Sequence, residues 1–273
     1  MNVLALDANA LFARSYFAAQ RLSPDPREAI TLAVNTMSLL LNPETNKIGL
    51  YFDKTLFAWD GQQNAAKGRE AKPPIYHETK AALMGVFEYL FSTVNVEHPE
   101  AEGDDIVATA VAAAKNADCV FVVSSDKDLM QLQGGNCQYY SLHDKAVLST
   151  SYITRKFHGI KHPAQVAIEL AIVGDGVDNI KGIHRYGEVK CRSLFKAVTP
   201  EMSFDEALEA IRAQLPAQQL AEFNAAFKRT LLRSDLDGIP APADLRLLPS
   251  RDVQVLDLPQ IEQNYERLQR AYR

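Results

Sequence analysis

Residues 98–132 constrain the fold most, because they place two tight groups of carboxylates around one helical run and one strand. The five acids are Glu102, Asp104, Asp105, Asp126 and Asp128. The first group opens a helical run, 106–114, where the amide dipoles favour negative charge. The second group follows an apolar run, 120–123, and the carboxyl ends of strands in open α/β sheets bind ligands. Carboxylates this close repel one another unless a cation such as Mg²⁺ holds them; the plain alternative is a solvated helix start and a solvated turn.

The composition is that of an ordinary globular protein. The chain has 273 residues, 47% hydrophobic and 23% charged, which suits one large domain or two smaller ones. No apolar run approaches the roughly 18 residues of a membrane span, and the first residues do not form a signal peptide. Cys119, Cys137 and Cys191 are widely spaced, which argues against a disulfide framework or a zinc site and predicts a cytoplasmic protein. The net charge of −5 does not exclude a nucleic-acid partner, because the distribution of charge decides.

Three apolar runs that each end in an aspartate predict a largely parallel sheet. Runs 3–6, 48–52 and 120–123 end at Asp7, Asp53 and Asp126. Helical patterns separate them, at 9–19, 27–41, 77–91 and 106–114, as in βα units. Parallel strands place their carboxyl ends at one edge of the sheet, so we expect these three aspartates to converge.

A polar segment, 54–82, directly follows the second predicted strand. Its basic residues are Lys54, Lys67, Arg69, Lys72 and Lys80. We expect this segment to reach over the acidic edge and hold phosphates. The alternative is a solvated loop.

Residues 153–200 are also enriched in basic residues. Asp175 and Asp178 lie three apart in a glycine-rich turn, and residues 181–187 are expected to join two helices through a short turn. This pattern resembles a helix–hairpin–helix, which grips a phosphate backbone without reading bases. Helices are expected at 204–215 and 217–231, and an apolar stripe over 258–272 is expected to dock on the protein's own core, with a partner helix as the alternative.

The acidic motifs, in this order and spacing, resemble the 5′-nuclease, or flap endonuclease, family. That family includes the 5′-nuclease domain of bacterial DNA polymerase I and stand-alone phage 5′–3′ exonucleases, and the absence of a polymerase domain indicates the stand-alone kind. The resemblance covers roughly residues 1–200. Its motifs are Asp7 after the first strand, Phe52-Asp53, Glu102-Gly-Asp-Asp105, Ser125-Asp-Lys-Asp-Leu129 and Gly174-Asp-Gly-Val-Asp-Asn-Ile180.

The resemblance implies an α/β fold with two domains. Residues 1–152 would form a PIN-like parallel-sheet nuclease core with a helical arch at about 54–82. Residues 153–273 would form a helical DNA-binding domain, with a helix-three-turn-helix module of the helix–hairpin–helix type at about 168–198. The implied DNA contacts are Lys72, Lys181, Gly182, Arg185, Gly187, Lys190 and Arg192.

The resemblance also implies the chemistry. Two Mg²⁺ ions, for which Mn²⁺ would substitute, would activate a water, neutralise the scissile phosphate and stabilise the leaving 3′ oxygen. Lys67 and Arg69 stand where the family carries basic arch residues that stabilise the phosphate. The implied metal ligands are Asp7, Asp53, Glu102, Asp104, Asp105, Asp126, Asp128, Asp175 and Asp178.

Two departures from the family pattern stand out. Residues 66–69 read Ala-Lys-Gly-Arg, one residue shorter than the family's Tyr-Lys-x-x-Arg and without its tyrosine. Arg185 occupies the position of the second glycine in the hairpin. Some hairpins of this type bind K⁺ through backbone carbonyls, and Arg185 argues against such an ion here.

The expected function is structure-selective, Mg²⁺-dependent cleavage near DNA 5′ ends or flap junctions, including RNA primer removal at RNA–DNA junctions, in replication or repair. We expect a monomer in the cytoplasm of a bacterial cell or phage-infected host, with a replication polymerase as partner and no membrane. An inactive branched-DNA-binding protein of this fold would have lost several acids, and a PIN-type ribonuclease would not need the basic hairpin. A haloacid-dehalogenase-type phosphatase needs an aspartate where this chain has Asn9.

Overall fold

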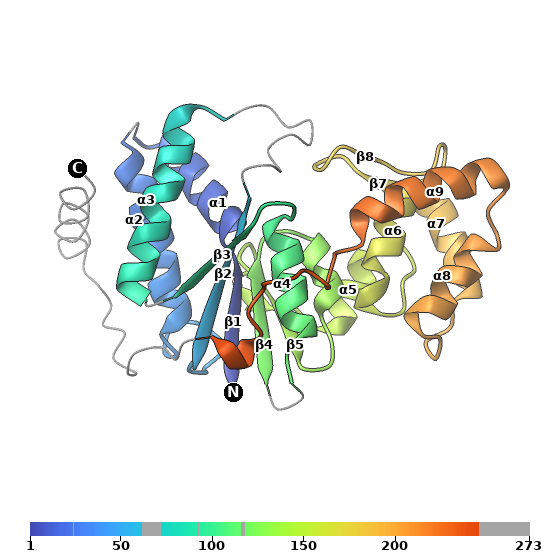
Figure 1. Ribbon diagram of the computed structural model, residues 1–273. Helices are drawn as coiled ribbons and strands as arrows, with labels where there is room; N and C mark the ends of the chain where they lie inside the picture. The colour runs from blue at the N-terminus through green and yellow to red at the C-terminus, as the bar shows by residue number, and fades with distance from the viewer. Residues whose placement is uncertain (24, 62–71, 92, 116–117, 246–273) are drawn as a thin grey trace. The chain divides into compact units, whose positions relative to one another are not determined.

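The computed structural model describes residues 1–245 except 24, 62–71, 92 and 116–117. The chain divides into two compact units (Figure 1). Unit 1 comprises Met1–Ser125, Tyr140–Ala146 and the chain from Ser234 onward, and unit 2 comprises Asp126–Tyr139 and Val147–Arg233. These units interleave along the chain, whereas the two domains that the resemblance implies meet at one boundary, residue 152. The expected C-terminal helix at 258–272 lies outside the described residues.

The centre of unit 1 is a sheet with the strand order β3-β2-β1-β4-β5-β6. β1 (Asn2–Asp7), β2 (Lys54–Asp60), β3 (Val94–His98) and β4 (Cys119–Ser124) pair in parallel. β5 (Cys137–Ser141) and β6 (Ala146–Val147) complete the order. Strands β1, β2 and β4 are buried along almost their whole length, as expected for parallel strands covered on both faces.

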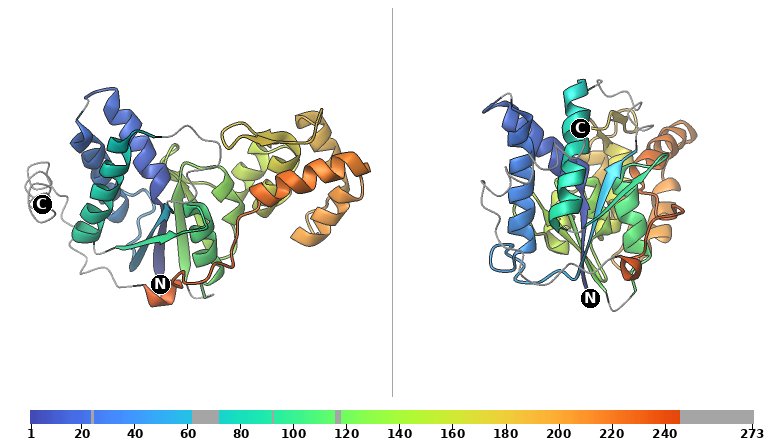
Figure 2. Two further views of the ribbon diagram at one scale, coloured as in Figure 1. Left: turned by 45° about the horizontal axis from the view of Figure 1, so that its top comes forward. Right: turned by 60° about the vertical axis from the view of Figure 1, so that its left-hand side comes forward.

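Helices cover both faces of the parallel strands (Figure 2). α1 (Ala8–Gln20), α2 (Pro26–Leu41) and α3 (Pro74–Phe91) lie on one face, and α4 (Gly103–Ala112) lies on the other. Right-handed crossovers explain this arrangement, because the chain steps from β1 to β2 to β3 in one direction and then returns to β4 on the far side of β1. The direction therefore reverses between β1 and β4, and such a switch point is where open α/β sheets bind ligands.

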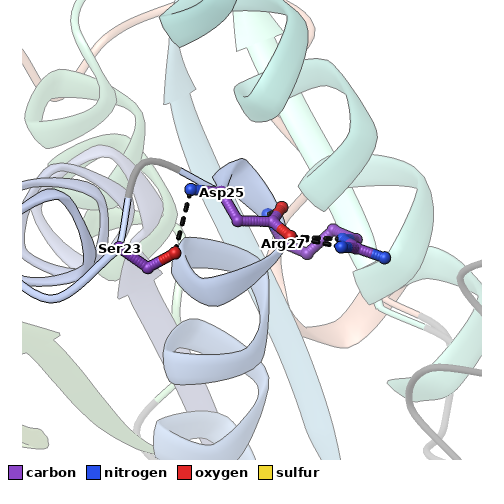
Figure 3. Close-up of polar contacts among 3 residues, drawn as sticks. All are labelled: Ser23, Asp25 and Arg27. Atoms are coloured by element: carbon purple, nitrogen blue, oxygen red, sulfur yellow. Dashed lines mark hydrogen bonds and ion pairs between the residues drawn. The ribbon is translucent and has the colours of Figure 1, made fainter.

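Helix α2 begins at a side-chain cap (Figure 3). The Arg27 amide donates to Asp25 Oδ1 at 2.9 Å, Arg27 Nε donates to Asp25 Oδ2 at 2.7 Å, and the Asp25 amide donates to Ser23 Oγ at 3.1 Å. Pro26 suits the first helical position because the N–H it lacks would have no helical partner. The hydrogen bonds from Arg27 hold the pKa of Asp25 below its usual range, so the cap stays charged.

Unit 2 is mainly helical. α6 is buried along most of its length and packs against α9. A two-stranded antiparallel ribbon, β7 (Gly174–Asp175) with β8 (Ile180–Lys181), follows α6. The helical segments are η2 (Asp128–Leu132), α5 (Thr150–Lys156), η3 (Pro163–Gln165), α6 (Val166–Val173), α7 (Glu188–Leu194), η4 (Phe195–Ala197), α8 (Phe204–Arg212) and α9 (Ala217–Thr230).

The expected strand at 48–52 was wrong. The buried side chain of Asn46 organises residues 46–50 as a loop instead: its Oδ1 accepts from the amides of Ile48 and Gly49 at 2.9 and 2.8 Å, and its Nδ2 donates to Leu50 O at 2.9 Å. The second strand of the chain is β2, which begins at Lys54. β3 was not predicted, because five residues with one buried side chain give little periodic signal.

Two connections also differ from expectation. Both ends of the segment predicted as an arch, 54–82, belong to other elements, because β2 occupies 54–60 and α3 begins at Pro74. Residues 62–71 of this segment lie outside the described residues. The prediction that residues 181–187 join two helices directly was wrong. The β7–β8 ribbon lies between α6 and the turn at 182–187, and α7 follows that turn. The other expected helices were confirmed with ends shifted by a few residues. Within the described ranges, no helix is both long enough and apolar enough to cross a membrane.

Candidate metal centre

Unit 1 gathers acids at the carboxyl edge of its parallel strands. Asp7 ends β1, and its Oδ1 accepts a hydrogen bond from the Ala10 amide at 3.0 Å, which caps α1. Its Oδ2 accepts from the hydroxyl of Ser124, the last residue of β4, at 2.7 Å. This hydrogen bond spans the switch point between β1 and β4, so Asp7 is fixed where this fold class binds ligands.

Asp60 brings three further acids to this edge. It ends β2, and its Oδ1 accepts from the Gly103 amide at 2.8 Å. Gly103 is the first residue of α4, whose cap and first turn carry Glu102, Asp104 and Asp105. A Cβ on Gly103 would lie 3.1 Å from the carbonyl oxygen of Ala58 in β2, so glycine permits this close approach.

Asp53 does not belong to this group, and the prediction that it converges with Asp7 was wrong. Asp53 precedes β2, and its Oδ2 accepts from the amide of Asn2, the first residue of β1, at 2.8 Å. It therefore lies at the amino edge of the parallel strands, while Asp7 lies at the carboxyl edge. Asp60 takes the place expected for Asp53, because the second strand was predicted too early.

A signal for Asp60 was present in the sequence. Asp60 directly follows the apolar run 56–59 and is followed by Gly61. A Cβ on Gly61 would come within 2.2 Å of the His98 carbonyl oxygen, so the chain requires glycine at that point. An apolar run followed by an aspartate is the same pattern that predicted the other strand ends.

Unit 2 gathers a second group of acids around a short helical segment and the ribbon. Asp126 and Asp128 flank Lys127 at the start of η2, and the Asp128 amide donates to Asp126 Oδ1 at 2.9 Å. Asp128, Asp175 and Asp178 each offer a carboxylate oxygen within 4.8 Å of the other two. Across the described parts of the chain, this is the one group of three or more acidic, histidine or cysteine ligands brought so close.

The electrostatics of this second group are unfavourable for bare carboxylates. Asp128 and Asp175 are only 5% and 2% exposed. Burial, followed by the charges of Asp126, Asp175 and Asp178, raises the pKa of Asp128 to about 8. Burial also raises the pKa of Asp126, with Asp178 and Asp175 adding to the effect. Lys127 partly compensates, with its Nζ 3.0 Å from Asp175 Oδ1.

These residues fit a hard divalent cation. Asp128 Oδ1 and Asp175 Oδ2 are buried, and neither accepts a hydrogen bond. A buried acceptor without a partner costs free energy, and a bound cation would satisfy both oxygens and relieve the repulsion. Oxygen-only ligands of this kind suit Mg²⁺, Mn²⁺ or Ca²⁺.

The basic residues expected to reach over the acidic edge differ in what the structure shows of them. Lys67 and Arg69 lie outside the described residues. Lys72 is exposed, with its Nζ 5.1 Å from the centre of the Phe17 ring. Lys54 and Lys80 instead support the structure of unit 1.

The two supporting lysines make specific contacts. Lys54 is buried and its Nζ donates to the Ala243 carbonyl at 2.6 Å. Lys80 Nζ donates to the Asp60 carbonyl at 2.9 Å and to Glu97 at 3.1 Å. The expectation that Lys54 reaches over the acidic edge was therefore wrong, and Lys80 anchors the end of β2.

The turn at 181–187 and the helix that follows it, α7, expose basic side chains predicted to contact DNA. These are Lys181 and Arg185 in the turn, and Lys190 and Arg192 in α7. Arg185 has φ +61°, a left-handed conformation that explains why the family carries glycine at this position. Gly182 is required by packing, because a Cβ there would lie 2.4 Å from the Ile172 carbonyl oxygen. Gly187 caps α7, and the DNA contacts of this turn stay a prediction.

The sequence of this chain is similar to those of known 5′-3′ exonucleases and DNA polymerases. Residues 2–161 match the family described as 5′-3′ exonuclease, N-terminal resolvase-like domain. A 5′-3′ exonuclease of Mycoplasmopsis pulmonis is 26% identical over 223 residues, which cover 79% of this chain and 73% of that protein. DNA polymerase I of Bacillus subtilis is 27% identical over 256 residues, which cover 90% of this chain but 28% of that protein.

Solved structures confirm the expected fold class. A bacteriophage T5 5′-exonuclease with bound divalent metal ions (zinc) has a TM-score of 0.60 at 15% identity, covering 85% of this chain and 88% of that one. A bacteriophage T5 flap endonuclease in a pseudo-enzyme-product complex with DNA and metal ions has a TM-score of 0.57 at 15% identity, covering 99% and 98%. The PIN-like α/β core predicted from the sequence is thus shared with these nucleases.

Proposed function

Because this chain belongs to the 5′-3′ exonuclease family, we propose that it is a divalent-metal-dependent nuclease that hydrolyses DNA near 5′ ends or flap junctions. The observation that carries the proposal is the buried group formed by Asp128, Asp175 and Asp178, whose oxygens lie within 4.8 Å of one another. The name of the Mycoplasmopsis relative and the DNA-bound T5 flap endonuclease support this substrate class.

The proposed resident ions are two Mg²⁺, with Mn²⁺ as a substitute. When bound, they would supply an activated water, charge neutralisation at the scissile phosphate and stabilisation of the leaving 3′ oxygen. The protein's part is to hold the carboxylates charged and fixed. The proposed ligands in unit 2 are Asp126, Asp128, Asp175 and Asp178, and those in unit 1 are Asp7, Asp60, Glu102, Asp104 and Asp105.

The roles of the basic residues remain proposals. Lys67 and Arg69 would stabilise the negative charge on the phosphate as it is cleaved. The turn at 181–187, with Lys190 and Arg192, would hold DNA phosphates without reading bases. Removal of RNA primers and a replication polymerase as partner are supported by the similarity to a part of DNA polymerase I.

The test compares cleavage of a 5′-labelled flap and a nicked duplex by the wild type, Asp128→Asn and Asp205→Asn. Asp205 is an exposed acid in the first turn of α8 and serves as the matched control. We expect cleavage with Mg²⁺, none with EDTA, and a loss of about 1,000-fold in Asp128→Asn, which corresponds to about 4 kcal/mol. Product lengths would separate flap cutting from exonuclease stepping. Binding without cleavage in Mg²⁺ and Mn²⁺ would contradict the proposal.

A further inference from the structure

We infer that the last turn of α9 positions the metal ligands of unit 2, through Arg229 on that turn and Gln131 on η2. This inference rests on the proposed function, because it concerns the same acidic group. Neither residue carries a carboxylate, and the polar contacts that carry this inference are with backbone groups of the protein. Their part is to fix the backbone segments that carry the ligands.

Arg229 holds the ribbon at the ligand Asp178. Its Nη2 donates to the Asp178 carbonyl at 2.8 Å, and its Nη1 donates to the Asn179 carbonyl at 3.1 Å. Asn179 has φ +52°, a left-handed conformation that costs a non-glycine residue free energy. The planar guanidinium grips two successive carbonyls at once, so it stabilises the backbone conformation that presents Asp178.

Gln131 holds the segment of the ligand Asp128. Its buried Nε2 donates to the Asp128 carbonyl at 2.8 Å and to the Thr230 carbonyl at 3.1 Å. Its Oε1 accepts from the Leu232 amide at 3.3 Å. The side-chain amide therefore ties η2 to the residues that end α9.

Thr230 completes the arrangement by holding α6. Its Oγ1 donates to the Ala167 carbonyl at 2.8 Å, and this hydrogen bond is buried. α6 leads directly into β7, which carries Asp175. Segments that carry Asp128, Asp175 and Asp178 are thus attached to one helix turn. Carboxylates that repel one another need such support, because groups behind metal ligands set the affinity of a site.

The test is Mn²⁺ binding to the full-length chain without DNA, measured by titration calorimetry. The variants are Arg229→Ala, Arg229→Lys and Lys228→Ala, a neighbouring exposed cation on the same helix. We expect Arg229→Ala to weaken Mn²⁺ binding about 10-fold, as is typical when support behind metal ligands is removed. Arg229→Lys should recover part of this loss, because an ammonium can still reach a carbonyl, and Lys228→Ala should bind as the wild type does.

Two further measurements distinguish the positioning of the metal ligands by Arg229 from a general loss of structure and from the loss of one positive charge. Circular dichroism melting should show similar midpoints for Arg229→Ala and Lys228→Ala. On flap DNA the two variants should lose similar affinity, since each removes one positive charge, while kcat falls in Arg229→Ala alone. Gln131→Leu, of similar size but without the amide, should repeat the Mn²⁺ defect; if it fails to fold, the Arg229 variants decide.

The Mn²⁺ titrations distinguish failure of this inference from failure of the proposed function. The inference is overturned if Arg229→Ala binds Mn²⁺ like the wild type, or if Lys228→Ala weakens binding equally. If instead the wild type does not bind Mn²⁺, or Asp128→Asn binds it equally well, the proposed metal centre itself is refuted.

Discussion

The acidic groups of the two units both consist of carboxylates, but these are held in different ways. In unit 1, donors from the protein satisfy the carboxylates: Asp7 accepts from an amide and a hydroxyl, and Asp60 accepts from the first amide of α4. In unit 2, Asp128 and Asp175 are buried beside other acids, and each has an oxygen that accepts no hydrogen bond.

This difference shows that acidic residues can either support a fold or strain it. Carboxylates at helix starts and strand ends stabilise those ends, because they accept from otherwise unpaired amides. Carboxylates buried against one another lower the stability of the metal-free protein, and a bound cation returns that free energy as affinity. The predictions that follow use substitutions that should affect the two groups in opposite ways.

Of the comparisons that follow, the largest effect is expected from replacing, one at a time, the two aspartates that border β2, Asp60 and Asp53. Asp60→Asn should lower kcat/KM on a 5′-flap substrate about 100-fold, or about 2.7 kcal/mol, because Asp60 lies at the carboxyl edge with Asp7. Asp53→Asn should stay within about 3-fold of the wild type, because Asp53 lies at the opposite edge. Comparable losses in both variants, with both proteins folded, would show that position at the sheet edge does not select the ligand.

An intermediate effect is expected on metal-free stability. Burial and neighbouring charges raise the pKa of Asp128 in the folded protein to about 8, against about 3.9 in an unfolded chain. The folded state therefore keeps this proton over a range in which the unfolded state has lost it. The stabilisation that this proton gives the folded protein is therefore fully present below about pH 4, and it is lost as the pH rises through about 8.

Asp128→Asn should remove this pH-dependent loss. In EDTA we expect the variant to be more stable than the wild type by about 1–2 kcal/mol at pH 8, with the difference shrinking toward pH 4. Urea unfolding at several pH values measures it, and Asp205→Asn is the control. A variant less stable than the wild type at pH 8 would mean that repulsion in unit 2 is not significant.

The smallest effect is expected from the hydrogen bond at the switch point in unit 1. Ser124→Ala removes the hydroxyl that donates to Asp7 Oδ2 at 2.7 Å, in a fully buried position. The free energy of unfolding should fall by about 1 kcal/mol, the opposite sign to Asp128→Asn. The control is Ser193→Ala, at an exposed position in α7. If the two serine variants are equally stable, the hydrogen bond to Asp7 does not stabilise unit 1, which would contradict the proposed difference between the two acidic groups.

The sequence by itself determined most elements and much of the candidate centre. The apolar runs at 3–6 and 120–123 became the buried strands β1 and β4, and the helical patterns became helices in the expected order. The resemblance implied that Asp128, Asp175 and Asp178 are metal ligands, which stays a prediction, and the structure brings their oxygens together in unit 2. The strand and helix predictions succeed because hydrophobic periodicity reports on local burial.

Tertiary structure alone decided the features that depend on distant parts of the chain. Asp53 and Asp60 both border an apolar segment, but the pairing of β2 with β1 placed Asp60 at the same edge of the sheet as Asp7, and Asp53 at the opposite edge, where it accepts from the Asn2 amide. The contacts of Arg229 with the ribbon and of Gln131 with Thr230 join residues about 50 and 100 positions apart. No local pattern specifies such contacts, because they arise when separately formed elements pack and satisfy each other's polar groups.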